Sequence, residues 1–150
     1  METETRLKVL IVDDHDIVRK GLAMLLSRQA DFLVVGEAGT VVEAVKKAQN
    51  LEPDVVVLDI QLPDGSGVEA CREMRDNDKD IKVLMLTSYS GEEAVMGSIM
   101  AGASGYLLKE ILSQEIVDAI RTVGEGNSLL APNVTAGVLE RVRQGCEEEP

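Results

Sequence analysis

The segment Asp54–Gly67, DVVVLDIQLPDGSG, decides how this chain folds, because it sets a charged side chain at the end of an apolar run. Val55–Leu58 is continuously apolar and rich in β-branched residues, which is typical of a strand buried on both faces of a sheet. Asp59 follows at once, and the residues after it have the proline and glycine content of a loop. The segment therefore raises the question of why a buried strand delivers a carboxylate to its own end.

Apolar runs of this kind recur along the chain, and most are continuous rather than alternating, which favours a parallel sheet covered on both faces. The predicted strands are Val9–Val12, Leu33–Val35, Val55–Leu58, Val83–Leu86 and Tyr106–Leu108. Segments with helical periodicity lie between them. The first two have apolar stripes at Ile17, Val18, Leu22, Leu25 and Leu26, and at Val41, Val42, Val45 and Ala48.

Capping signals mark the helix starts that the periodicity predicts. A Ser or Thr followed three residues later by Glu forms a capping box. Such pairs are Thr40–Glu43, Ser66–Glu69 and Ser90–Glu93, and Ser113 with Glu115 begins a fifth helix. Strand and helix thus alternate five times, which predicts an α/β fold with a doubly wound, five-stranded parallel sheet. The expected strand order, counted along the chain, is the flavodoxin-like 2-1-3-4-5.

The alternating pattern ends near residue 127, so residues 1–127 are expected to form one domain. Beyond it, Pro132 suits a first helical turn, and an apolar stripe predicts a sixth, C-terminal helix. The stripe consists of Val134, Val138, Leu139 and Val142. Residues 128–150 are therefore expected to be either a terminal cap or the start of a linker to a further domain.

Composition narrows the classes of function. The 150-residue chain has a net charge of −12, which disfavours non-specific binding to nucleic acid or anionic membranes and favours cations or basic partners. No apolar run approaches the roughly 20 residues of a membrane-spanning helix. The first residues, METETRLK, have no signal-peptide pattern, and Cys71 and Cys146 form no metal or redox motif. We expect a cytoplasmic protein.

Four of the five predicted strands end in polar side chains, and in a parallel sheet these ends meet at one edge, where α/β folds bind ligands. They are Asp13, Asp14 and His15, then Asp59, then Thr87 and Ser88, and finally Lys109. Three carboxylates about 4 Å apart would repel by roughly 1–4 kcal/mol per pair, so protons or a cation must relieve them. An all-oxygen set suits Mg²⁺, while Lys109 and Thr87 suit a bound anion.

Each of these side chains also has an ordinary structural explanation. Asp13 and Asp14 could cap the first helix, and Asp59 could be a turn residue. Lys109 could be a surface lysine, and Thr87 a plain strand-end hydroxyl. The combination of complementary groups at one edge nevertheless indicates a site. His15, the single histidine, is expected to be exposed at the start of the first helix.

The ordered motifs resemble the receiver domain of bacterial two-component response regulators over about residues 6–127. The matching segments are VLIVDDHD, VVVLDIQLPDGSG, LMLTS and GASGYLLKE. The DDH start, GASGYLLKE and GNSLLAPNV are similar to the subfamily with a LuxR/NarL/FixJ-type helix-turn-helix. The resemblance implies that residues 128–150 are the linker to a DNA-binding domain that is absent from this chain.

The resemblance also implies roles for individual residues. Asp59 would accept a phosphoryl group from a sensor histidine kinase. Asp13, Asp14, the Asp59 carboxylate and the backbone carbonyl of Gln61 would hold Mg²⁺ as cofactor. Beyond this self-catalysed transfer and slow autodephosphorylation, no enzyme activity is expected.

A conformational switch completes the implied mechanism. Lys109 would pair with the bound phosphoryl group, and Thr87 would move toward it. Tyr106 would then turn inward, and the changed surface would control homodimerisation and DNA binding through the absent domain. Glu110 stands where many receivers have proline, so we expect no cis peptide after Lys109.

Three other functions are compatible with parts of this pattern. A haloacid-dehalogenase-type phosphatase also uses an Asp nucleophile, but it needs a second Asp two residues later, where this chain has Gln61. A nucleotide-binding domain needs a glycine-rich phosphate loop, which follows none of the predicted strands. A receiver that binds partners without phosphate is the third, and the complete set of acid, Thr and Lys side chains argues against it.

Overall fold

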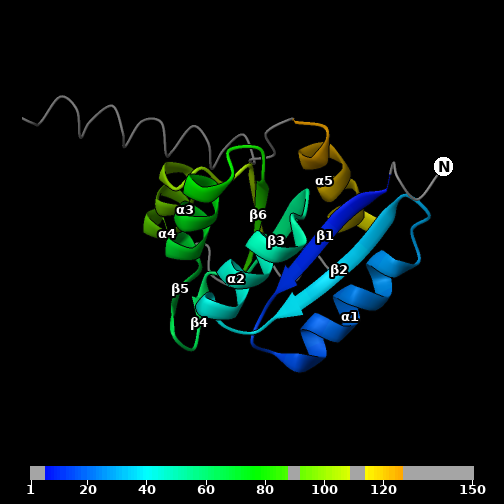
Figure 1. The fold of residues 1–150 in the computed structure, drawn as a ribbon, viewed down its shortest axis with the longest axis horizontal. Helices are drawn as coiled ribbons and strands as arrows, with labels where there is room; N and C mark the ends of the chain where they lie inside the picture. The colour runs from blue at the N-terminus through cyan, green and yellow to red at the C-terminus, as the bar shows by residue number, and fades with distance from the viewer. Residues whose placement is uncertain (1–5, 88–91, 109–113, 127–150) are drawn as a thin grey trace, which may run out of the picture.

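The computed structural model describes residues 6–87, 92–108 and 114–126, without the side chains of residues 87 and 92–95 (Figure 1). The elements are β1 Leu7–Val12, α1 Asp16–Ser27, β2 Phe32–Ala38, α2 Val41–Leu51, β3 Val55–Leu58, β4 Gln61–Leu62, β5 Gly65–Ser66, α3 Gly67–Asn77, β6 Lys82–Thr87, α4 Glu92–Met100, β7 Gly105–Leu108 and α5 Gln114–Gly124. The predicted sixth helix in 128–150 lies outside the described residues.

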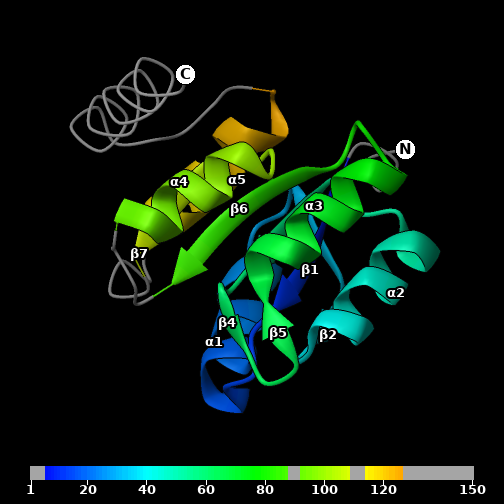
Figure 2. The same cartoon turned by 90° about the vertical axis from the view of Figure 1, so that its left-hand side faces the viewer.

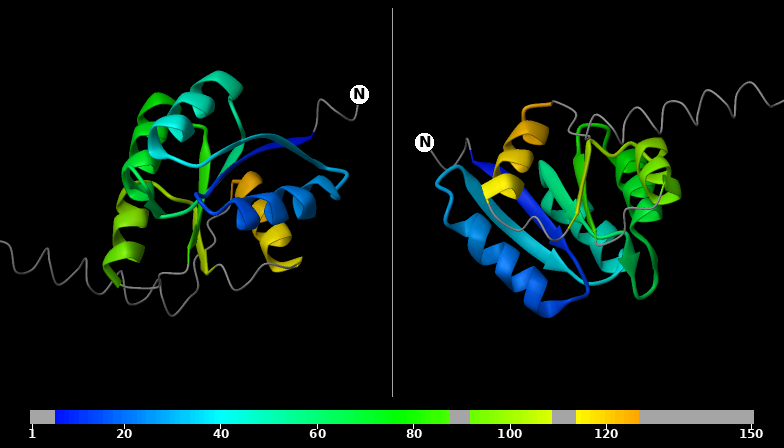
Figure 3. Two further views of the ribbon diagram at one scale, coloured as in Figure 1. Left: turned by 90° about the horizontal axis from the view of Figure 1, so that it is seen from below. Right: turned by 180° about the vertical axis from the view of Figure 1, so that it is seen from behind.

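The main sheet has the order β2-β1-β3-β6-β7, and all its strand pairs are parallel. This is the predicted order 2-1-3-4-5 once the short strands β4 and β5 are set aside. Helices α1 and α5 cover one face of the sheet, and α2, α3 and α4 cover the other (Figure 3). The predicted doubly wound α/β fold is therefore confirmed.

The central strand β3 explains why its sequence is continuously apolar. Val55 and Val57 pack in the layer with α1 and α5, whereas Val56 and Leu58 pack in the layer with α2 and α3. All four side chains are at most 1% exposed. Because both faces are buried, no position of the strand tolerates a polar side chain, and the first carboxylate comes only after the strand has ended.

For two residues of the predicted helical stripes, the expected burial is wrong. Ile17 is 88% exposed and Val42 is 71% exposed. At about 100° per residue, Ile17 lies on the opposite side of α1 from the buried Leu26, and Val42 lies about 120° from the buried Ala48. The two side chains belong to the first turns of their helices but not to the faces that contact the sheet.

The capping predictions hold in part. Thr40 Oγ1 accepts a hydrogen bond from the Glu43 backbone N–H at 3.1 Å, as a capping box requires. The Glu43 carboxylate, however, accepts from the N–H of Gly39 at 2.8 Å rather than from that of Thr40. Ser66 caps α3 by accepting from Val68 N–H at 3.1 Å. The starts predicted at Ser90 and Ser113 lie outside the described residues.

Within the part of the chain that the structure describes, no helix is both long and apolar enough to cross a lipid bilayer.

Candidate functional site at the carboxyl edge of the sheet

The expected convergence of carboxylates is observed at the carboxyl ends of β1 and β3. These strands pair in parallel with Val12 opposite Leu58, so the residues that follow them are neighbours. Ligand atoms of Asp13, Asp14, His15 and Asp59 all lie within 4.8 Å of one another. The strand register alone therefore brings together side chains separated by more than forty positions in sequence.

Two of these carboxylates are buried. Asp13 is 2% exposed and Asp59 is 3% exposed, whereas the side chain of Asp14 is 34% exposed. Asp59 N–H donates to Val12 C=O at 3.0 Å, and Asp59 Oδ1 accepts from Gln61 N–H at 3.2 Å. Asp59 is thus fixed between the central strand and the loop that follows it, and its carboxylate faces the other acids.

The donor chemistry of the cluster fits a hard divalent cation. The three carboxylates supply oxygen ligands, and placing like charges this close in a mostly buried site is unfavourable without a compensating positive charge. Mg²⁺ binds through one or a few carboxylates and keeps several water ligands. The partly exposed side chain of Asp14 leaves room for these waters. Asp13, Asp14 and Asp59 are therefore suited to holding this ion.

His15 has a closer relation to the site than the sequence suggested. Its side chain is 64% exposed, as expected, yet Nδ1 lies 2.9 Å from Asp13 Oδ1 and 3.2 Å from Asp14 Oδ1. The backbone N–H of His15 also donates to Asp13 Oδ1 at 2.9 Å. The sequence offered one indication of this contact, because His15 directly follows the acidic pair in the same loop.

The segment after Asp59 forms a short hairpin where the sequence predicted an irregular loop. Strands β4 and β5 pair antiparallel, with Gln61 opposite Ser66 and Leu62 opposite Gly65. Figure 2 shows this hairpin projecting from the start of α3. Leu62 is buried against the core, which anchors the hairpin and holds the Gln61 backbone beside Asp59.

Gly67 ends the hairpin in a position that only glycine can occupy without a shift of the backbone. Its N–H donates to Ile60 C=O at 2.6 Å. A Cβ at this position would lie 2.0 Å from the carbonyl oxygen of Asp59 and 2.9 Å from the Cα of Ile60. The missing side chain therefore allows α3 to begin directly against the backbone of Asp59.

The hairpin is also tied to the start of α2 by Asp64. Its two carboxylate oxygens accept from the N–H groups of Val41 and Val42 at 2.7 and 3.1 Å. Hydrogen bonds from these helix N-terminal amides hold the pKa of the Asp64 carboxyl below its usual value. Sequence analysis missed this contact, because twenty-three positions separate Asp64 from Val41.

Two of the remaining predicted site residues, Thr87 and Tyr106, belong to β6 and β7, the last two strands in the order of the sheet. Thr87 is the last residue of β6, and its backbone pairs with Leu108 of β7. The Thr87 side chain lies outside the described residues, and so do Lys109 and the peptide bond that follows it. Tyr106 is 8% exposed and packs in the core layer of α2 and α3. The movement of Tyr106 and Thr87 in a switch stays a prediction.

The parallel sheet and the buried carboxylates at its carboxyl edge place this protein in the class of doubly wound α/β domains that bind ligands at this edge. Comparison with known proteins identifies the family. The family described as response regulator receiver domain matches residues 9–121. The chain belongs to this family, whose members are signalling proteins rather than classical enzymes.

Individual relatives agree with this assignment. The chain is 44% identical over 142 residues to the DNA-binding transcriptional activator DevR/DosR of Mycobacterium tuberculosis, covering 95% of this chain and 65% of that relative. It thus spans just under two thirds of the relative's length. The crystal structure of a LuxR-family two-component response regulator from Aurantimonas matches with a TM-score of 0.82 and 34% identity, covering 91% of this chain and 97% of that one.

A third match is to a structure that contains Mg²⁺ and BeF₃. It is a chain of the CheX–CheY–BeF₃–Mg²⁺ complex from Borrelia burgdorferi, with a TM-score of 0.72 and 28% identity. The match covers 81% of this chain and 90% of the other.

Proposed function

We propose that this chain accepts a phosphoryl group on Asp59 from the phosphohistidine of a sensor histidine kinase, in a Mg²⁺-dependent reaction. The observation that carries the proposal is the burial of Asp59 at the end of the central strand, within 4.8 Å of Asp13 and Asp14. An Asp59 oxygen attacks phosphorus, and a P–O bond forms as the P–N bond breaks. The leaving imidazole keeps the electron pair of the broken bond and takes up a proton from water. Carboxylates serve as covalent nucleophiles of this kind.

The acidic residues prepare the site for this transfer. Asp13, Asp14, Asp59 and the backbone carbonyl of Gln61 would hold Mg²⁺, which when bound neutralises charge on the transferred oxygens. The presence of Mg²⁺ and BeF₃ in the complex with the similar Borrelia burgdorferi chain supports this choice of ion. Because Asp59 directly follows the buried strand β3, its backbone is held in a fixed position at the carboxyl edge of the sheet.

Three further residues complete the proposed switch. Lys109 pairs with the phosphoryl group once it is attached, and the hydroxyl of Thr87 donates to one of its oxygens. Phosphorylation adds charge and strong acceptors, and these draw Thr87 toward Asp59. Tyr106 occupies the space that Thr87 leaves, which changes the surface formed by α4, β7 and α5.

We further propose that residues 1–127 are the receiver and that 128–150 begin a linker to a DNA-binding domain. The length of the DevR/DosR relative, of which this chain covers 65%, supports the additional domain. The surface change would then drive homodimerisation and DNA binding in the longer, cytoplasmic protein. The chain would also lose its phosphoryl group slowly by autodephosphorylation.

Mass spectrometry after incubation with acetyl phosphate and Mg²⁺ tests the central step. Wild type should gain the mass of one phosphoryl group, Asp59→Asn should gain none, and Asp54→Asn should behave as wild type. Asp54 is a suitable control because it lies at the opposite end of the same strand. No gain by wild type, with a donor shown to phosphorylate another receiver, would refute phosphoacceptor function and favour a phosphate-independent binding module.

A second measurement tests the output in the longer protein. Under phosphorylating conditions, wild type should bind its promoter more tightly than Asp59→Asn in a gel-shift titration. Equal binding would show that Asp59 does not control the DNA-binding domain.

A further inference from the structure

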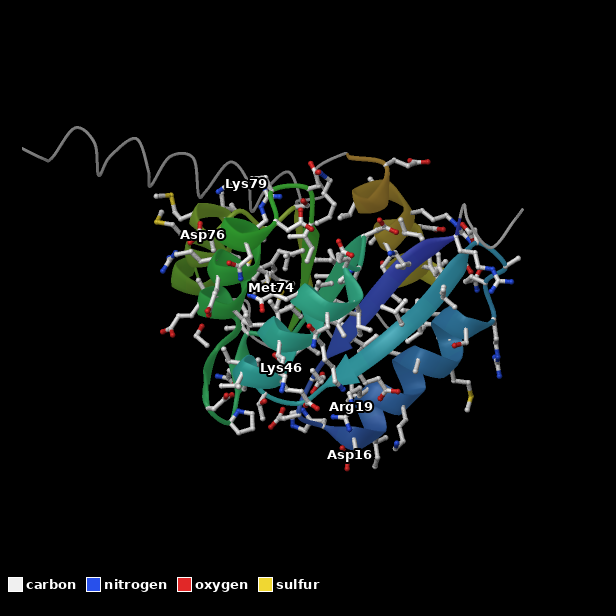
Figure 4. The ribbon with its side chains drawn as sticks, viewed as in Figure 1. Asp16, Arg19, Lys46, Met74, Asp76 and Lys79 are labelled. Atoms are coloured by element: carbon white, nitrogen blue, oxygen red, sulfur yellow. The ribbon has the colours of Figure 1, made fainter. Side chains whose placement is uncertain are left out.

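The side chain of Arg19 joins three parts of the carboxyl edge. Figure 4 shows Arg19 and Asp16 close together at the start of α1, beside the end of β2. Nη1 donates to the backbone carbonyl of Asp13 at 2.7 Å, Nε donates to Glu37 Oε1 at 3.0 Å, and Nη2 donates to Asp16 Oδ1 at 2.6 Å. Each nitrogen of the guanidinium therefore contacts a different segment: the loop after β1, strand β2 and helix α1.

The contact with Asp13 acts on the backbone of the acidic pair. Asp13 N–H donates to Ala38 C=O at 3.0 Å, and Asp13 C=O accepts from Arg19, so both polar groups of its main chain are held. The Asp13 carbonyl belongs to the planar peptide unit whose N–H is that of Asp14. Fixing this plane restricts the directions in which the two carboxylates leave the backbone.

The guanidinium itself has little freedom. The Arg19 side chain is 16% exposed, and a Cβ at Gly39 would lie 3.5 Å from its Nη1. A planar guanidinium can satisfy three acceptors at fixed angles, whereas a lysine ammonium would be a point charge on a flexible stem. The orientation that Arg19 imposes on Asp13 is therefore specific to arginine.

We propose that Arg19 is a positioning residue, which aims Asp13 and Asp14 at the metal through the peptide unit that joins them. The proposal rests on the Mg²⁺ site of the proposed function and goes beyond it, because Arg19 supplies no ligand atom. In metal sites, partners that orient the ligands commonly change metal affinity by 10–100-fold when they are removed. Loss of Arg19 should thus weaken Mg²⁺ binding in a protein that remains folded.

Isothermal titration with Mg²⁺ provides the test, with Arg121→Met as the matched control. Arg121 makes a comparable set of contacts outside the cluster of Asp13, Asp14 and Asp59. Its Nε donates to Asp31 Oδ2 at 2.8 Å, and its Nη2 donates to Gln29 Oε1 at 3.0 Å. We expect Arg19→Met to raise the Mg²⁺ dissociation constant by about 10-fold and Arg121→Met to leave it unchanged. Urea unfolding of both variants should show that each loses some stability.

The outcomes separate the two levels of the argument. Wild-type Mg²⁺ affinity in a folded Arg19→Met variant would overturn the positioning role and leave the proposed metal site intact. Failure of the wild-type protein to bind Mg²⁺ would overturn the metal site and the positioning role together. If Arg19→Met does not fold, Arg19→Lys replaces it. This variant keeps the charge and the stem but not the planar contacts, so it should bind Mg²⁺ more weakly than wild type, and equal binding would refute the proposal.

Discussion

The two edges of the parallel sheet are both acidic, but their carboxylates have different environments. At the edge where the strands begin, Glu52, Asp54, Asp78 and Asp80 line a groove of about 680 Å³ between α2 and α3. Asp54 Oδ2 accepts from Lys8 N–H at 2.8 Å, and Asp78 Oδ1 accepts from Asp80 N–H at 2.9 Å. These four side chains are exposed or half-exposed, and both hydrogen bonds are accepted from backbone amides.

At the carboxyl edge, Asp13 and Asp59 are almost completely buried and point toward each other and Asp14. Burial keeps solvent from screening their repulsion, so a bound cation would stabilise this edge more than the other. The comparison shows that a count of acidic residues does not locate the site. Convergence and burial locate it, and both follow from the pairing of β1 with β3.

The largest expected difference between the edges is in metal binding. Asp13→Asn removes a buried carboxylate from the cluster and should weaken Mg²⁺ binding by at least about 10-fold. Asp54→Asn removes the same charge from the exposed groove and should leave Mg²⁺ affinity unchanged. Calorimetric titration of both variants measures the two constants. Equal weakening by both would mean that Mg²⁺ responds to net charge alone, and the distinction between the edges would be wrong.

The next prediction concerns the backbone that supports Asp59. Gly67→Ala places a Cβ 2.0 Å from the Asp59 carbonyl, so the hairpin must shift. We expect a loss of about 3 kcal/mol in the free energy of unfolding, together with slower phosphorylation by acetyl phosphate.

Gly21→Ala is the matched control for Gly67→Ala. A Cβ at Gly21 meets nothing within 4 Å, and the residue lies inside α1. This variant should gain about 0.5–1 kcal/mol, because alanine favours the helix. Urea denaturation checks both values. A Gly67→Ala variant as stable as wild type would show that the close approach is not a constraint.

The sequence predicted the fold and the acids because both depend on strong local signals. Continuous apolar runs such as Val55–Leu58 identify buried strands, and the geometry of a parallel sheet then brings Asp13 and Asp59 together without further information. The contacts of Arg19 and Asp64 were not predictable in this way. They join polar groups from different helices, strands and loops, and their partners depend on tertiary packing rather than on spacing along the chain.

A smaller effect should distinguish the two ends of α2, which lie at opposite edges. Thr40→Ala removes the oxygen that accepts from Glu43 N–H, and should cost about 1 kcal/mol. Glu52 closes the helix in a left-handed conformation with φ 49°, so Glu52→Gly should relieve strain and stabilise by a few tenths of a kcal/mol to about 1 kcal/mol. Opposite signs in urea denaturation are expected, and a destabilised Glu52→Gly would contradict the strain.

The smallest effects concern the pH dependence of stability at each edge. Backbone amides of α2 lower the pKa of Asp64, and the hydrogen bond from Arg121 lowers the pKa of Asp31, which precedes β2 at the opposite edge. A carboxyl with a lowered pKa contributes stability above its unfolded value of about 3.9, and this contribution is lost as the pH falls through the folded value. Asp64→Asn and Asp31→Asn should therefore be less stable than wild type at pH 7, and both differences should shrink below about pH 4.

Salt and a second variant should then separate the two carboxylates. The Asp31–Arg121 pair is about half exposed, so about 1 M NaCl should reduce the effect of Asp31→Asn. In an Arg121→Met background, Asp31→Asn should have almost no further effect, because its partner is gone, whereas Asp64→Asn should keep its full effect. Urea unfolding at pH 7 and pH 3.5 provides the values. If Asp64→Asn also lost its effect in that background, the stabilisation by Asp64 would depend on the charge of Arg121. Its stabilisation would then not come from the N-terminus of α2, and the link between the hairpin and α2 would have to be abandoned.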